Sequence, residues 1–301
     1  MCIPSKEKIN TSQVIRVALL IEYIGSPFSG SQYQPNQTTV QSAVLFALQQ
    51  LNVPVQSVNF ASRTDAGVHA KGQVAHFDID ACRLSNIDDL ACALNACLPE
   101  FIAIKNIKLA THMQFHSRNR ALAKWYRYQI FNGSQRSVWQ SRDCYFFRRP
   151  LNVEKMNQAC QYFIGKHNFK SFKGTNPAVS NHICQVFNAK VTFNEALVTF
   201  DIVANRFLYK MVRNLAGQLL QIGDNRKQMP TERMLKLLQC QDRTKVASTA
   251  PPEGLTLMAI AYPPPFDYFH ADPYVKKLHS MLELNQMEFL NDEKDIRCKA
   301  S

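Results

Sequence analysis

A carboxylate and a cation lie two residues apart in a segment that has the composition of a tight turn. Asp65 follows Arg63 by two positions and is itself followed by Ala66 and Gly67. Asp-Ala-Gly is a turn signal, because Asp bonds to its own backbone and Gly accepts conformations that other residues avoid. A carboxylate fixed at a loop tip can serve as a nucleophile or as a general base. An ordinary Asx turn explains the same residues and is the more frequent use of Asp-x-Gly.

The segments around this turn predict the elements that would hold it. Strands are expected at residues 14–23, 53–61, 73–79 and 101–109, and helices at 40–51 and 87–98. Thr38 and Thr39 begin a capping-box pattern before the first helix, and Asn86 is a cap for the second. The turn with Asp65 therefore joins two strands within a β-α-β-β-α-β unit.

The same order of elements returns in the rest of the chain. Strands are expected at 121–131, 183–193, 197–204 and 256–262, with helices after Asn152, from Asn205 to Ile222, and from Pro230 to Gln239. The prediction is an α+β fold of two tandem ferredoxin-like halves, with antiparallel sheets packed side by side around a central cleft. The halves would span residues 1–112 and 113–269, and residues 270–301 would form a tail with a candidate docking helix.

Two further sets of residues could act together with Asp65. Arg206, Lys210 and Arg213 are spaced i, i+4 and i+7, so a helix from Asn205 would place them on one face. A solvated basic stripe explains this spacing equally well. Tyr126 lies in the strand segment Lys-Trp-Tyr-Arg-Tyr, where it is either a core aromatic or a platform on which a planar ligand stacks.

Composition limits the classes of partner. Lys and Arg number 35 against 23 Asp and Glu, so the formal net charge is +12 over 301 residues, which favours a polyanion such as nucleic acid or an anionic membrane surface. No apolar run reaches the roughly 18 residues of a membrane span, and the polar N-terminus does not resemble a secretory signal. The nine cysteines include no C-x-x-C pair, which predicts reduced thiols in a cytoplasmic protein. Neither Cys92 with Cys97 nor His112 with His116 has a second pair at zinc spacing, so no metal site is predicted.

The string from Arg63 to Gln73 resembles the signature of the TruA-type tRNA pseudouridine synthases. Further matches follow in the family's order: Gly25, Gln32, Asn95, Phe115 to Arg118, Tyr126 to Tyr128, Met211 to Asn214, Asp242 to Thr244, Gly254 and Leu255. The ordered set extends over about residues 14 to 265, and such an order is harder to obtain by chance than any single motif. The sequence departs from the family pattern at Ile24, Ser31 and Asn181-His182, and its tail is longer than is typical.

The resemblance implies an isomerase that converts uridine to pseudouridine in the anticodon stem-loop of tRNA, at tRNA positions 38 to 40. It implies Asp65 as the catalytic residue, acting at C1′ or C2′ of the ribose, with Arg213 as the cation that balances its charge. No metal and no small-molecule cofactor is implied. The partners implied are tRNA and a second copy of the chain, in a cytoplasmic homodimer.

The resemblance also implies which residues bind the substrate. Tyr126 would stack on a uracil flipped out of the helix, and Leu255 would form an apolar wall of the pocket. Arg63 would assist flipping, while Lys210 and Arg206 would contact phosphates.

A non-catalytic RNA-binding protein is the alternative, because RRM-type modules also present aromatic residues on a sheet of this kind. The presence of Asp65, Arg63, Tyr126 and Arg213 together favours the enzyme, because a binder gains nothing from a carboxylate that faces a polyanion.

Overall fold

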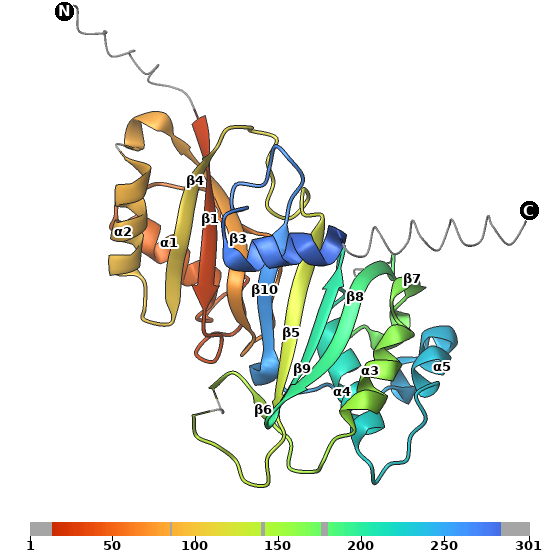
Figure 1. Cartoon of the computed structure of the whole chain (residues 1–301). Helices are drawn as coiled ribbons and strands as arrows, with labels where there is room; N and C mark the ends of the chain where they lie inside the picture. The colour runs from red at the N-terminus through yellow and green to blue at the C-terminus, as the bar shows by residue number, and fades with distance from the viewer. Residues whose placement is uncertain (1–13, 85, 140–141, 176–179, 284–301) are drawn as a thin grey trace, which may run out of the picture.

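The computed structural model describes residues 14–84, 86–139, 142–175 and 180–283 (Figure 1). Helices and strands are mixed along this part of the chain, and most strand pairs are antiparallel. None of its helices combines the length and the apolar character that crossing a membrane requires. The chain is therefore an α+β protein, as predicted.

The first half follows the predicted β-α-β-β-α-β order. Its elements are β1 (Val14–Tyr23), α1 (Val40–Gln50), β2 (Asn59–Phe60), β3 (His69–Asp80), α2 (Ile87–Cys97) and β4 (Ile102–Ala110). Thr39 caps α1 in a capping box with Ser42, and Asn86 caps α2 by accepting a hydrogen bond from the Asp88 backbone N–H. These caps fix where both helices begin.

The second half contains the predicted elements and two short strands besides. Its elements are β5 (Ala123–Phe131), β6 (Tyr145–Phe146), α3 (Val153–Gln161), β7 (Gly165–Asn168), β8 (Ile183–Asn194), β9 (Leu197–Ala204), α4 (Met211–Gly223), α5 (Arg233–Cys240) and β10 (Leu255–Ala261). As predicted, Asn152 caps α3 by accepting a hydrogen bond from the Lys155 backbone N–H.

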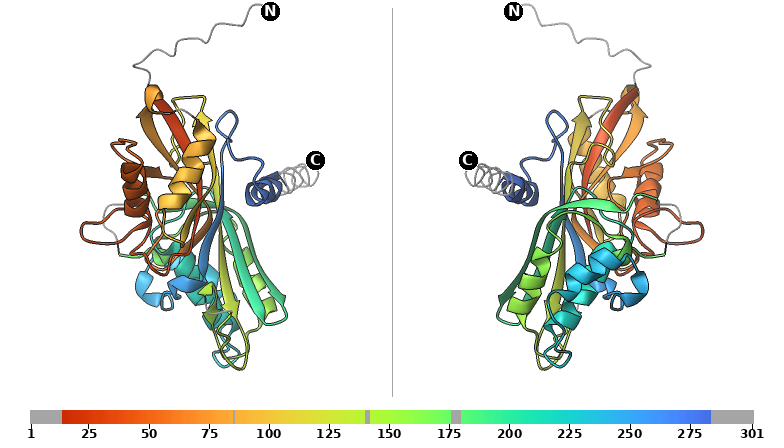
Figure 2. Two further views of the ribbon diagram at one scale, coloured as in Figure 1. Left: turned by 90° about the vertical axis from the view of Figure 1, so that its left-hand side faces the viewer. Right: turned by 90° about the vertical axis from the view of Figure 1, so that its right-hand side faces the viewer.

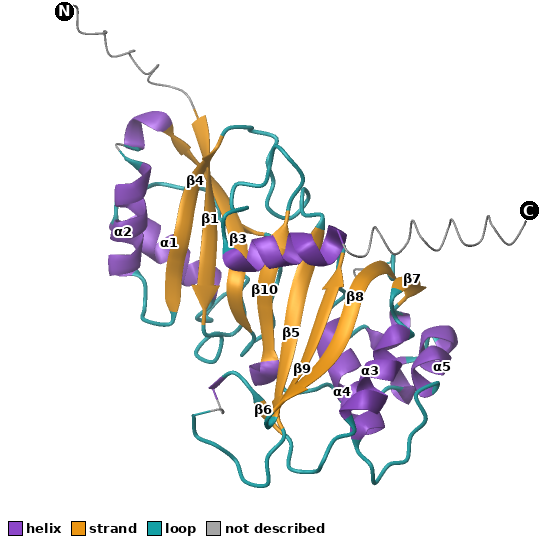
Figure 3. Ribbon diagram, in the orientation of Figure 1, coloured by secondary structure: helices purple, strands orange, loops and turns teal. Residues whose placement is uncertain are grey.

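The strands form one sheet in the order β4-β1-β3-β10-β5-β9-β8-β7, with β2 beside β3 and β6 beside β5 (Figure 3). The last strand, β10, joins the two halves: it runs parallel to β3, with Thr256 opposite His69, and antiparallel to β5. The two neighbouring sheets that the sequence predicts are thus parts of one continuous sheet.

Two details differ from the sequence prediction. The strand expected at 53–61 is reduced to β2, because residues 53–58 make no strand pairing and their apolar pattern reflects the separate burial of Val53 and Val58. The strand β7 begins at Gly165 and extends into the segment 166–182 that was expected to be a loop, and at four residues it is too short to show an alternating pattern.

A helix over residues 273–283 crosses one face of the sheet in front of β10 and β5 (Figures 1 and 2). Tyr274 lies edge-on to Trp125. The ammonium groups of Lys71 and Lys105 lie over the Tyr274 ring. Lys105 also forms an ion pair with Asp272, with 2.8 Å between Nζ and Oδ2. Figure 2 places this helix on the face opposite to α1 and α2.

The helix at 273–283 contributes to the core, since Val275 and Leu278 are 1 % and 0 % exposed. This packing predicts that removing the helix would lower the stability of the protein. We expect Leu278→Ala to lower the free energy of unfolding by about 2–5 kcal/mol, as for other fully buried leucines. Lys276→Ala, on the exposed side of the same helix, should change it by less than about 0.5 kcal/mol. Equal effects of the two changes in urea unfolding would contradict the docking.

Candidate active site

Asp65 lies in the turn between β2 and β3, as the sequence predicts. The Val68 N–H donates to the Asp65 backbone oxygen, which closes the turn. Gly67 has a φ of +79°, and a Cβ added there would lie 3.0 Å from the Pro252 side chain. Both facts require glycine at this position, because a side chain would be strained and would press against Pro252. The turn is therefore held against the segment that precedes β10.

Arg213 pairs with Asp65 across the junction of the two halves. Its Nη1 lies 2.6 Å from Oδ2 of Asp65, and the two side chains are only 12 % and 18 % exposed. The Nε of Arg213 donates to the Ala250 carbonyl at 2.8 Å, so the guanidinium is oriented by two partners. A shielded pair of this kind holds the carboxylate in one place and balances its charge. The structure thus brings together the two residues that the sequence assigned to catalysis.

The helix that carries Arg213 begins later than predicted. It starts at Met211, because Lys210 adopts a left-handed conformation with a φ of +58°. Asn205 does not cap it; the Asn205 side chain instead accepts a hydrogen bond from the Gln185 N–H and extends the pairing of β8 with β9. The helix expected from Asn205 is therefore wrong at its start, and Arg206 and Lys210 do not share a helical face with Arg213.

Lys210 and Arg206 lie in the loop between β9 and α4 and are both partly buried. The Nζ of Lys210 lies 5.2 Å from the centre of the Tyr209 ring. Arg206 is close enough to Lys124 to help lower the pKa of that lysine. Both cations thus belong to the loop that leads into α4 rather than to the helix itself.

Tyr126 lies in the middle of β5 on the same face of the strand as Lys124 and Tyr128. Its side chain is 5 % exposed, and its hydroxyl lies 2.8 Å from Oγ of Ser62, two residues after β2. Phe207 contacts the Tyr126 ring edge-on, with 5.1 Å between ring centres. Burial raises the pKa of the Tyr126 phenol, so this group is protonated at neutral pH. The tyrosine is therefore tied to the loop that carries Asp65.

Leu255 is the first residue of β10 and is 6 % exposed. It pairs with Tyr128, and Leu257 pairs with Tyr126, so the two leucines and the two tyrosines line the same face of neighbouring strands. Arg63 is exposed and has no ion-pair partner among the residues that the structure describes. Its side chain is therefore accessible from solvent.

Sequence reasoning missed three residues that the structure places here: Ser62, Phe207 and Lys124. The Nζ of Lys124 donates to the Ala61 carbonyl at 2.8 Å, just before the Asp65 loop. Burial lowers the pKa of Lys124 to about 8, and the cations Arg118 and Arg206 add to this effect. The alternation of Lys124 with Tyr126 was a usable signal for Lys124, whereas nothing in the local sequence marks Ser62 or Phe207.

Comparisons with known proteins bear on this arrangement. Residues 19–118 and 159–263 match the model of a family described as tRNA pseudouridine synthase. A tRNA pseudouridine synthase A of Chlamydia trachomatis serovar L2b is 38 % identical over 255 residues, which are 84 % of this chain and 94 % of that protein. The protein of the same name from Salmonella arizonae is 40 % identical over 260 residues, 85 % of this chain and 93 % of its own. One from Shewanella piezotolerans is 39 % identical over 253 residues, or 84 % and 95 % of the two chains.

Among solved structures, a chain of a Cbf5-Nop10-Gar1 complex aligns with 86 % of this chain and 59 % of its own, at 12 % identity and a TM-score of 0.35. That likeness is too low to support a conclusion. The family match includes Asp65 and Arg213, and leaves out the strand that carries Tyr126.

Proposed function

Because this chain belongs to the tRNA pseudouridine synthase family, we propose that it isomerises uridine to pseudouridine in the anticodon stem-loop of tRNA, at tRNA positions 38 to 40. The observation that carries the proposal is the shielded ion pair of Asp65 with Arg213, at 2.6 Å between the two halves. An enzyme of this kind needs a fixed carboxylate beside a nucleotide, and this pair supplies one.

The reaction is balanced without a second reactant. The bond between C1′ and N1 of the base breaks, a bond between C1′ and C5 forms, C5 loses a proton, and N1 gains one. Asp65 is proposed to act on the ribose, either by attack on C1′ or by removal of a proton from C2′. Arg213 serves both routes, because it fixes the carboxylate oxygen at one position and leaves Oδ1 with no hydrogen bond among the described contacts.

The base is proposed to lie against Tyr126. A uridine inside a helix is out of reach, so it has to leave the stack and enter a pocket that an aromatic ring can line. Phe207 and Leu255 would form the sides of that pocket, and the exposed Arg63 would assist flipping at its mouth.

We expect Tyr126→Phe to retain tRNA affinity and Tyr126→Ala to lose activity by about 100-fold or more. Phe keeps the ring and its edge-on contact with Phe207, whereas Ala removes both the platform and a buried ring. Single-turnover rates and filter binding would measure the two effects. A Tyr126→Ala protein that reacts at the wild-type rate would show that the ring is only a part of the core.

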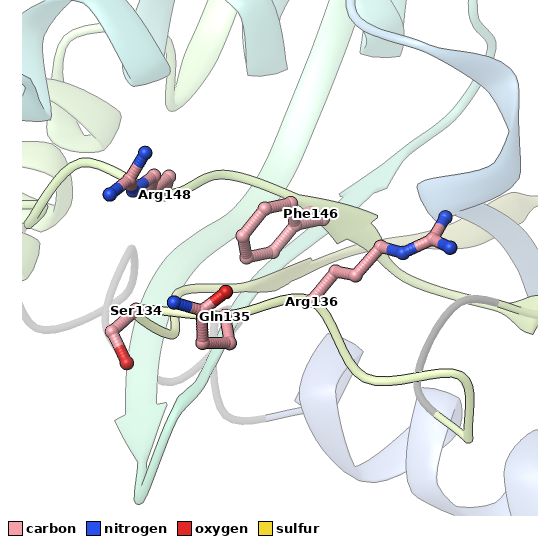
Figure 4. A pocket seen from close by; sticks show the side chains of 5 residues that line it. All are labelled: Ser134, Gln135, Arg136, Phe146 and Arg148. Atoms are coloured by element: carbon pink, nitrogen blue, oxygen red, sulfur yellow. The ribbon is translucent and has the colours of Figure 1, made fainter.

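The phosphate backbone is proposed to bind to cations in two regions. The first is the loop that leads into α4, the helix of Arg213, where Arg206 and Lys210 lie. The second is a cavity of about 340 Å³ in the segment between β5 and α3, which includes β6; it is lined by Ser134, Gln135, Arg136, Phe146 and Arg148 (Figure 4). Arg136 and Arg148 lie on either side of the Phe146 ring in that view, and both are exposed. Neither has an ion-pair partner in the described part of the chain, so both can meet phosphates.

Replacing Arg136 and Arg148 together with Gln should weaken tRNA binding and make it less dependent on salt. Each lost phosphate contact is expected to lower the slope of log K against log salt by about 0.7–0.9. The single-turnover rate at saturating enzyme should stay within about twofold of wild type, because neither residue contacts Asp65 or Arg213 in the described part of the chain. An unchanged salt slope would show that the cavity does not contact the RNA.

Two ferredoxin-like halves, over residues 1–112 and 113–269 with a tail at 270–301, are proposed on the strand order. In the first half β1 lies between β4 and β3, and in the second β5 lies between β10 and β9, so both orders follow one pattern. The central cleft is supported by the meeting of Asp65 from one half with Arg213 from the other. A cytoplasmic homodimer is proposed by analogy with the family.

The deciding experiment is to incubate the purified protein with unmodified tRNA transcripts and to map pseudouridine by position. Pseudouridine at tRNA positions 38 to 40 is expected. Tight tRNA binding without any pseudouridine would favour the RRM-like binding protein instead, and pseudouridine outside the anticodon stem-loop would keep the reaction and overturn the target.

A further inference from the structure

Two buried polar side chains, one amide and one hydroxyl, hold the backbone on either side of Arg63. The first is Gln73 on β3, which is 0 % exposed. Its Oε1 accepts from the Ser62 N–H at 3.2 Å, and its Nε2 donates to the Ser62 carbonyl at 2.7 Å. The Gln73 side chain thus makes with Ser62 the pair of backbone hydrogen bonds that a neighbouring strand would otherwise make.

The second is Ser31, in the loop after β1, and it is also 0 % exposed. Its Oγ accepts from the Thr64 N–H at 2.8 Å, and its backbone N–H donates to the Thr64 carbonyl at 3.1 Å. Gly30 allows this close approach, because a Cβ there would lie 2.8 Å from the Thr64 oxygen. Ser31 therefore binds the residue that precedes Asp65 at two points.

Tyr23 connects the two contacts. Its hydroxyl lies 2.8 Å from Oγ1 of Thr64 and accepts from Nε2 of Gln73 at 3.4 Å. Burial raises the pKa of this phenol to about 12, while hydrogen bonds with Thr64, Gln73 and Ser31 act against the rise. The phenol is protonated at neutral pH, so the connection persists over the range in which enzymes work.

These contacts leave the backbone of the Asp65 loop little freedom. Ser62 and Thr64 are held from inside the protein, whereas Arg63 is exposed and Asp65 meets Arg213. Gln73 also acts on Tyr126, because the Ser62 hydroxyl that it helps to place is the partner of the Tyr126 hydroxyl.

We propose that Ser31 and Gln73 are positioning residues that fix Asp65 and Tyr126 relative to each other through two-point contacts with Thr64 and Ser62. This inference rests on the proposed function. Neither residue touches the substrate. Each acts by keeping the reacting groups within the narrow range of geometry that a rapid step requires, where an error of about 1 Å can cost about 100-fold.

The test is a single-turnover measurement with enzyme in excess over a tRNA transcript, together with tRNA binding. Ser31→Ala is expected to lower the rate constant about tenfold and Gln73→Met about 100-fold, since Met has a similar size but forms neither bond. The affinity for tRNA should stay within about twofold, and the amplitude of the reaction should stay complete. Ser171→Ala is the matched control: Ser171 is also 0 % exposed, and its hydroxyl donates to the Leu237 carbonyl at 2.6 Å, away from the Asp65 loop. Its rate constant should equal that of wild type.

The rate constant at saturating enzyme separates positioning from general damage, because a misfolded fraction only lowers the effective enzyme concentration, while the folded fraction reacts at its own rate. Wild-type rate constants for both variants at saturating enzyme, or losses that disappear when the enzyme concentration is raised, would overturn the inference. If both variants fail to fold, Tyr23→Phe removes only the hydroxyl that connects the two contacts, and it should still react about threefold to tenfold more slowly; a wild-type rate would again overturn the proposal. A wild-type protein that makes no pseudouridine would instead reject the proposed function itself.

Discussion

An Asp65→Asn protein is expected to bind tRNA at least as tightly as wild type and to form pseudouridine at least about 1,000-fold more slowly. Asn keeps the size of the side chain and an oxygen that can accept from Arg213, so the loop should keep its shape. It removes the charge that either ribose mechanism needs, and a nucleophile or general base contributes rate factors of this order. Because RNA is a polyanion, loss of a negative charge should not weaken binding.

Lys210→Ala is the matched comparison, because Lys210 lies in the loop just before Arg213 but is not assigned to the chemistry. Binding should weaken and become less dependent on salt, while the rate at saturating enzyme stays near that of wild type. Salt-dependent filter binding and single-turnover rates give both quantities for both proteins. An Asp65→Asn protein that reacts at the wild-type rate would remove Asp65 from the mechanism.

Elements with strong local signals could be predicted from the sequence. Asn86 and Asn152 mark the starts of α2 and α3 because their side chains accept from backbone N–H groups in the first turn, which is a local interaction. Asn205 is the same kind of capping residue, but its side chain accepts a hydrogen bond from the Gln185 backbone N–H on a neighbouring strand instead of capping a helix. A cap residue that directly follows a strand has two competing partners, and the contact with the neighbouring strand prevails here.

The contact between the two halves could not be predicted from local sequence patterns. The pairing of β10 with β3 joins residues near 256 to residues near 69, and no local pattern reports a contact over such a separation. The meeting of Asp65 with Arg213 could be predicted only from the family resemblance. Ser31, Tyr23 and Gln73 could not be assigned from residue type, because buried polar residues show their role only through the backbone groups that they bond.

Arg213 is the second residue whose replacement should have a large effect, and the size should depend on how much of its geometry survives. Arg213→Leu leaves the Asp65 carboxylate, which is 18 % exposed, without its cation and leaves the Ala250 carbonyl without the Nε donor. Loss of one partner of a shielded pair leaves the other charged group without its counter-charge in a poorly solvated position. The single-turnover rate should therefore fall by about 100-fold to 1,000-fold.

Arg213→Lys keeps a positive charge but offers one nitrogen in place of the planar group that reaches Asp65 through Nη1 and Ala250 through Nε. A single ammonium cannot occupy both positions, since the two guanidinium nitrogens are fixed relative to each other. If charge balance alone matters, the Lys protein should react nearly as fast as wild type. If orientation of the carboxylate matters, as the two bonds of the guanidinium indicate, its rate should fall about tenfold or more and lie between those of wild type and Arg213→Leu. Single-turnover rates of the three proteins on one tRNA transcript, with binding measured in parallel, distinguish these cases, and equal rates for all three would show that the ion pair has no part in the reaction.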